Sequence, residues 1–264
     1  MMKEKKICAA CGTQFPLRDL ASAICPICTD DRQYVPDSGQ AWTTITELLR
    51  NFSINRQRLT EDLYELQMSP SFAIGQRALL VVAPEGNILW DCIPLLDEPT
   101  VAFIRSKGGL KCIAFSHPHF YSTMSNWADV FDCPIYIHQK DERWILDDSK
   151  HVSLWSGIEK ELWNGMRLIN IGGHFPGSTI LLVPFLSPNG ALLCGDTFVV
   201  SPNKKHIAVM HSYPNRIPLP LSEVARIKEQ MRPVTFDSIH GWNNSQCILR
   251  EAKQVLESSL AKYT

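Results

Sequence analysis

The chain has 264 residues, of which 45% are hydrophobic, and a formal net charge of -1. This content suffices for one large domain with a full core and one small module. The near-neutral charge argues against a nucleic-acid partner, and no apolar stretch reaches the roughly 20 residues of a membrane span. Because no apolar signal-peptide core follows the charged N-terminus, we expect a cytoplasmic protein.

The first predicted element is a small metal-binding module. Cys8 with Cys11, and Cys25 with Cys28, form two CxxC pairs. Each CxxC turn points two thiolates at one ion, and two turns complete a tetrahedron. The pairs resemble the knuckles of zinc ribbons and rubredoxins, so we expect a structural zinc ion, with iron as the alternative. A module this small has almost no core, and the ion is expected to supply its folding energy.

Composition divides the chain into three parts. Residues 1–36 form the predicted zinc-ribbon-like module, residues 37–59 a polar linker with a short helix, and residues 60–264 the main domain. Thr44 and Glu47 have the spacing of a capping box and predict the start of that helix. We expect the module to dock on the main domain or on another subunit.

From there the chain alternates between apolar strands and amphipathic helices. Strands are predicted over 78–83, 88–90, 110–115, 133–138, 166–171, 179–186, 191–194 and 234–239. Helices are predicted over 99–106, 123–131 and 247–260. Strands mixed with helices, without an internal repeat, predict an α/β or α+β layered domain.

Metal-binding residue types recur where the predicted strands end. Each of six residues lies within a few positions of the C-terminal end of a strand: Asp91, His117, His119, His174, Asp196 and His240. Glycines flank three of these positions, and glycine lets loops pack closely around an ion. Residues that follow strands from distant parts of the chain can converge at one site, so this pattern predicts a metal centre.

In this order, these residues resemble the metallo-β-lactamase superfamily over residues 60–264. The resemblance implies an α+β fold, a four-layer αβ/βα sandwich with the metal site at one edge between two sheets. The segment 173–178 is similar to the His-loop of glyoxalase II-like hydrolases. The resemblance also implies that one zinc ion is held by His117, His119 and His174, with iron as the alternative metal.

The chain departs from the superfamily motif His-x-His-x-Asp-His, because Tyr121 and Ser122 occupy its last two positions. The resemblance implies that a second ion is held by the missing Asp-His pair and by His240, with Asp196 commonly bridging. Neutral tyrosine and serine oxygens are poor ligands at pH 7. We therefore predict one tightly held ion, with the second site weak or empty.

The remaining site residues receive roles from their positions. Asp196 completes the coordination or holds the attacking water, and His240 acts as an acid to a leaving group or binds an anionic substrate. Tyr121 is expected to donate to a developing oxyanion, and Asp91 to orient the loop of the first two histidines. His211 is either a pocket-lining residue or an ordinary surface histidine.

These observations favour a metal-dependent hydrolase of a small ester, thioester, lactone or amide. One alternative is an iron oxygenase of the persulfide dioxygenase type, in which His117, His174 and Asp196 form a two-histidine, one-carboxylate face. The other is a non-catalytic, metal-stabilised binding protein. The expected partner is a small-molecule substrate, without nucleic acid or membrane, and the chain is compatible with a homo-oligomer.

Overall fold

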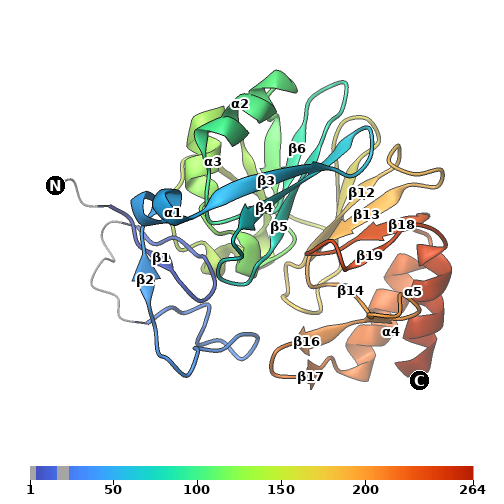
Figure 1. The fold of residues 1–264 in the computed structure, drawn as a ribbon. Helices are drawn as coiled ribbons and strands as arrows, with labels where there is room; N and C mark the ends of the chain where they lie inside the picture. Colours follow the sequence, from blue (N-terminus) through green and yellow to red (C-terminus); the bar gives the residue numbers. More distant parts are fainter. Residues whose placement is uncertain (1–3, 17–23, 264) are drawn as a thin grey trace.

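The computed structural model describes residues 4–16 and 24–263, and in these two β-sheets pack face to face with helices on their outer sides (Figure 1). Residues 1–3, 17–23 and 264 lie outside the described residues, so part of the predicted 1–36 module is not covered. The order helix, sheet, sheet, helix is the expected four-layer α+β sandwich. The cysteine-rich N-terminal segment lies beside the first sheet.

The first sheet has seven strands among the described residues, in the order in which they occur along the chain. They are β3 (Ser53–Arg58), β4 (Leu63–Ser69), β5 (Arg77–Val81), β6 (Ile88–Trp90), β7 (Cys112–Ala114), β8 (Ile135–His138) and β9 (Val152–Trp155). Strands β6 to β9 run parallel. Helix α2 (Glu98–Ser106) lies in the β6–β7 crossover, helix α3 (Met124–Phe131) in the β7–β8 crossover, and a segment with a 3-10 helix connects β8 to β9.

The second sheet has the order β10-β11-β12-β13-β18-β19. Its strands are β10 (Glu159–Glu161), β11 (Arg167–Asn170), β12 (Thr179–Val183), β13 (Ala191–Cys194), β18 (Ser238–His240) and β19 (Cys247–Ile248). Helices α4 (Leu221–Met231) and α5 (Ala252–Leu260) pack on its outer face. Within this sheet, as far as the described residues go, only the β13–β18 pair is parallel, and α4 lies in its crossover.

The smaller elements are strands β1 (Ile7–Cys8), β2 (Trp42–Thr43), β14 (Val199–Val200), β15 (Ile207–Ala208), β16 (Met210–Ser212) and β17 (Ile217–Pro218), helix α1 (Ile45–Asn51), and the 3-10 helices η2 (Pro118–Phe120), η3 (Gln139–Trp144) and η4 (Ala261–Tyr263). The predicted cap of α1 is present, because the Thr44 side chain accepts a hydrogen bond from the Glu47 backbone N–H.

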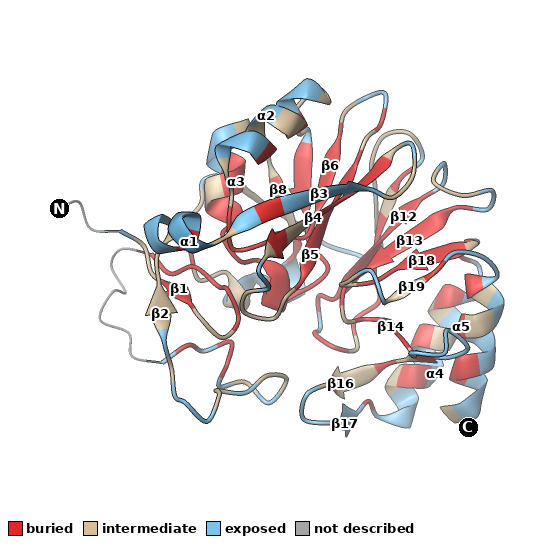
Figure 2. Ribbon diagram, viewed as in Figure 1, coloured by how far each residue is buried: buried red, intermediate tan, exposed pale blue. Residues whose placement is uncertain are grey.

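Successive side chains along a strand point to opposite faces of the sheet, and this alternation divides the core into layers. Leu79 and Val81 face the second sheet, whereas Ala78 and Leu80 face the helices of the first half. Both faces of these central strands are therefore buried (Figure 2).

Three predicted boundaries are wrong. The strand predicted over 234–239 begins only at β18, Ser238–His240. Strand β3 belongs to the first sheet, so the main domain begins before residue 60, inside the stretch predicted as linker and helix. The predicted helix over 247–260 is divided into β19 and α5, because Cys247 and Ile248 pair with β18. Among the described residues, no helix is long and apolar enough to cross a membrane.

Candidate metal centre

Three imidazoles and one carboxylate meet between the two sheets. His117, His119, His174 and Asp196 each place one ligand atom within 4.8 Å of all the others. The Asp196 Oδ2 atom lies 3.5 Å from His117 Nε2 and 3.8 Å from both His119 Nδ1 and His174 Nε2. Tetrahedral ligands at the usual zinc distances lie roughly 3.3 Å apart, so the group is close to coordination geometry.

Each ligand follows a strand of the sandwich. His117 and His119 flank the start of η2, just after β7, while Asp196 follows β13. The residue before this aspartate must be glycine, because a Cβ at Gly195 would lie 2.2 Å from Ser116 Oγ and 2.8 Å from His117 Nδ1. Close packing of two loops that come from different sheets thus brings the ligands together.

Hydrogen bonds on the outer side of His117 fix which ring nitrogen faces the cluster. Ser116 Oγ donates to the Asp91 carboxylate at 2.9 Å and lies 2.8 Å from His117 Nδ1. When Asp91 is ionised, the hydroxyl proton is used on its carboxylate, so the oxygen accepts from Nδ1–H, and Nε2 keeps its lone pair. Asp91 therefore orients the histidine loop through Ser116, a residue that the sequence analysis did not single out.

Asp91 is buried, and burial raises its pKa to about 8, against the lowering effect of the Ser116 donors. A cation bound by the histidines would favour the ionised form of Asp91. It would thereby favour the arrangement in which Ser116 donates to Asp91 and accepts from His117 Nδ1–H.

His174 is oriented by a backbone carbonyl. Its Nδ1 lies 2.7 Å from the His211 oxygen, which can only accept, so Nδ1 carries the proton and Nε2 faces the cluster with its lone pair. His211 thus contributes its backbone to the site, while its own ring contacts Asp31 at 2.9 Å.

The donor set fits a divalent cation. Burial lowers the pKa of His117 to about 4 and that of His174 well below its usual value, so both rings are neutral ligands at pH 7. His117 Nε2 is buried without a hydrogen-bond partner among the described residues. Three neutral imidazoles and one carboxylate are typical zinc ligands.

The departure from the superfamily motif has a structural counterpart. Tyr121 is 3% exposed and packs its ring on Phe115 in the core, where burial raises its pKa well above the usual value. Ser122 Oγ donates to the Gly12 carbonyl at 3.1 Å, and the Gln14 N–H donates to the Ser122 carbonyl at 3.1 Å. The position that the superfamily gives to a metal-binding histidine thus contacts the N-terminal module. The oxyanion role of Tyr121 stays a prediction.

His240 lies outside the group of four converging ligands. It is 4% exposed at the end of β18, with Nδ1 3.8 Å from Cys247 Sγ. The next residue, Gly241, accepts two hydrogen bonds from Arg77, whose guanidinium also pairs with buried Glu65 at 2.6 Å. The predicted acid and ligand roles of His240 stay predictions.

Buried, neutral His240 predicts a pH-dependent stability. Burial and the Arg77 charge lower its pKa to about 4, against about 6.5 in the unfolded chain. The unfolded state therefore binds more protons between these values, and this group's contribution is lost as pH falls through that window. Between pH 7.5 and 5.0, urea unfolding should show that His240→Gln loses about 2 kcal/mol less stability than wild type. An equal loss in both proteins would contradict this, and exposed His206→Gln serves as the control.

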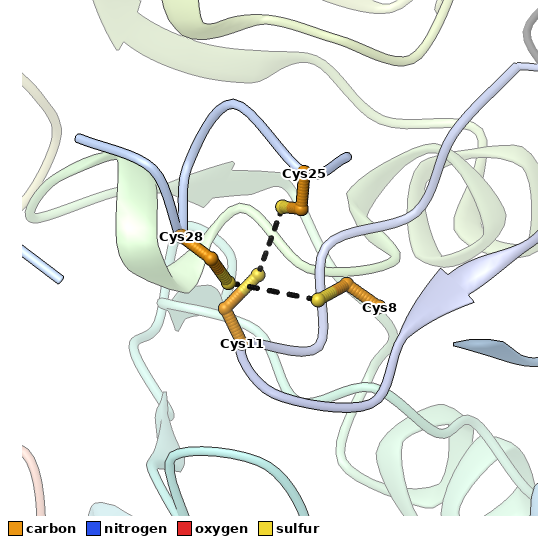
Figure 3. A group of neighbouring side chains, drawn as sticks. All are labelled: Cys8, Cys11, Cys25 and Cys28. Carbon is orange, nitrogen blue, oxygen red and sulfur yellow. Dashed lines mark hydrogen bonds between the residues drawn. The ribbon is translucent and has the colours of Figure 1, made fainter. Parts of the chain in front are cut away.

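The four predicted knuckle cysteines form a second converging group (Figure 3). Cys8 Sγ lies 3.6 Å from Cys28 Sγ, and Cys11 Sγ lies 3.6 Å from Cys25 Sγ. A tetrahedral zinc site with bonds of about 2.3 Å separates its sulfurs by roughly 3.8 Å. The thiols of Cys11, Cys25 and Cys28 hold the pKa of Cys8 well below its usual range, while burial raises that of Cys11 well above it. A dication at this position would stabilise all four sulfurs as thiolates.

A cavity of about 530 Å³ opens over the first group of ligands. His119 and Asp196 line it, together with residues of the N-terminal module such as Arg32 and Tyr34. A larger surface groove of about 1060 Å³ lies on the outer side of the His174 loop, along Gly172 and α4. We place the site at the smaller cavity, because the larger groove contains none of the four converging ligands.

The geometry defines a protein with the metallo-β-lactamase fold and a candidate three-histidine, one-aspartate metal centre. Its structure is similar to DIM-1 metallo-β-lactamase exposed to ceftazidime (TM-score 0.57, 13% identity, 80% of this chain and 98% of that one). It is also similar to the mono-zinc form of the metallo-β-lactamase FIM-1 from Pseudomonas aeruginosa (TM-score 0.56, 12% identity, 79% and 95%).

At the level of sequence, the chain belongs to the family of the uncharacterized protein YmaE of Bacillus subtilis (strain 168). The two are 36% identical over 260 residues, which cover 97% of this chain and 94% of that protein. No model of a known protein family matches the sequence.

Proposed function

We propose that the protein is a metal-dependent hydrolase of a small ester, thioester, lactone or amide. The observation that supports this most is the convergence of His117, His119, His174 and Asp196 at an open cavity. A divalent ion such as zinc would supply Lewis acidity and an activated water there. The loss of the superfamily's Asp-His pair, replaced here by Tyr121 and Ser122, favours a single ion at this centre.

The residues of the chain have separable tasks in this proposal. Ser116 and the His211 carbonyl hold two imidazoles with their lone pairs toward the centre, which removes the cost of reorientation. The Asp196 side chain is 17% exposed and lines the cavity, so its carboxylate can either complete the coordination of the ion or hold the attacking water beside it. Because the site lies on strand ends, these positions are rigid.

The test is hydrolysis of a panel of p-nitrophenyl esters, thioesters and lactones by purified protein. We expect turnover that a chelator abolishes and added zinc restores. Absence of metal-dependent turnover across the panel, in protein with a filled centre, would overturn the proposal. Iron at the centre together with oxygen consumption would instead support the oxygenase.

A further inference from the structure

The N-terminal module forms one wall of the cavity over the metal centre. Arg32, Gln33 and Tyr34, which follow the second cysteine pair, line the cavity together with His119 and Asp196. The opposite side is formed by residues of the second half of the sandwich, among them Tyr213 and Trp242. We call residues 32–34 the module wall. A substrate bound in this cavity lies beside the module wall.

The module wall is fixed in place by the loop that it faces. The Asn215 side chain donates to the carbonyls of Asp31 and Gln33 at 2.9 Å each, and Ser212 Oγ donates to the Arg32 carbonyl at 3.2 Å. The imidazole of His211 lies 2.9 Å from the Asp31 carboxylate. These bonds tie the wall to residues 211–215, so its side chains are presented in a defined position.

Arg32 joins the wall to a metal ligand. Its Nε donates to the His174 carbonyl at 2.6 Å, and its guanidinium lies over the Phe175 ring at 4.4 Å. Its charge is already paired, with Asp30 at 2.7 Å and Asp31 at 3.5 Å. Arg32 is therefore a positioning residue and offers no free cation to a substrate.

The chemistry of the wall suits an uncharged substrate. Tyr34 is 56% exposed, and Gln33, Tyr213 and Trp242 are neutral. Among the described lining residues, the only lysine or arginine is the paired Arg32. A substrate carboxylate placed away from the metal centre would be desolvated without gaining a positively charged partner. An aromatic or apolar group of the substrate would instead bury apolar surface against Tyr34 and Trp242.

We infer that the module wall determines substrate specificity, and that the substrate carries an uncharged aromatic or apolar group that packs on Tyr34. This rests on the proposed function only in calling the ligand a substrate. A cavity of about 530 Å³ is within the range of small-molecule sites. The N-terminal cysteine module thus has a second task besides its own metal site, which is to shape the pocket of the other.

The test is calorimetric titration of the zinc-loaded full chain with hydroxamates, which chelate metals and are not hydrolysed as esters. Tyr34→Ala should weaken binding of benzohydroxamate at least fivefold and leave that of acetohydroxamate within twofold. Tyr34→Phe should bind both like wild type, and Phe185→Ala, an exposed aromatic away from the cavity, is the matched control. Wild type should bind 4-carboxybenzohydroxamate at least fivefold more weakly than benzohydroxamate.

Three outcomes would overturn the inference: unchanged benzohydroxamate binding in Tyr34→Ala, an equal loss for both hydroxamates, or no benzohydroxamate binding to loaded wild type. His117→Ala should abolish binding of both ligands, which places them at the metal centre. The readout needs no turnover. Suppose that no ester is hydrolysed but Tyr34→Ala selectively loses binding of benzohydroxamate. The hydrolase proposal would then fail, whereas the inference that the module wall selects the ligand would be supported.

Discussion

Replacing His117 by alanine is expected to remove one metal ion per chain and to lower ester hydrolysis at least a thousandfold. Its Nε2 is 3.5 Å from Asp196 Oδ2 and has no hydrogen-bond partner among the described residues, so its lone pair is free to bind an ion. Without it, two imidazoles and one carboxylate remain. A thousandfold loss corresponds to about 4 kcal/mol of transition-state stabilisation, which is reasonable for loss of the activating cation.

The measurement is elemental analysis of metal per chain, paired with initial rates, on wild type and His117→Ala. Two zinc ions in wild type and one in the variant would support one structural and one catalytic ion. Three in wild type would show that Tyr121 and Ser122 have not emptied the second site, and the single-ion mechanism would be wrong. One ion in both proteins would favour the binding-protein alternative. His206→Gln, on the exposed surface, should match wild type.

The variant Cys8→Ser is expected to prevent the four-cysteine group from holding an ion and to perturb the candidate three-histidine centre from a distance. Structural zinc supplies about 10–16 kcal/mol of binding energy to small modules. Without it, the backbone between the knuckles and Arg32 is no longer held. The Ser122–Gly12 contact and the Arg32–His174 contact would weaken together. We expect kcat/KM to fall at least tenfold while the three-histidine centre retains its metal.

Hydrogen exchange separates this effect from general unfolding. Amides of residues 8–16 and 24–34 should exchange faster in Cys8→Ser, while those of β11 to β13 should keep their protection. Cys133→Ser, a buried thiol outside the four-cysteine group, is the control and should keep both ions. If Cys8→Ser lacks the ion of the four-cysteine group but keeps wild-type activity, the predicted link between this group and the three-histidine centre is wrong.

Local pattern was sufficient to predict much of the fold. Strand β6 and helix α2 lie almost where the apolar runs predict them, because burial on both faces or on one stripe leaves a readable period. Strand β3, with the sequence SINRQR, was missed because it is an edge strand whose side chains are mostly exposed, so no alternation marks it.

The sequence by itself determined which residues can bind metal. Ligand chemistry depends on residue type, and the histidines, Asp196 and the paired cysteines are recognised from their types and their order along the chain. Only the tertiary structure decided what lies next to them. It shows that Ser122 contacts Gly12, that Ser116 connects Asp91 to His117, and that Arg32 reaches His174. Such contacts join segments far apart in the chain, and they depend on the shape of packed surfaces, which no local period encodes.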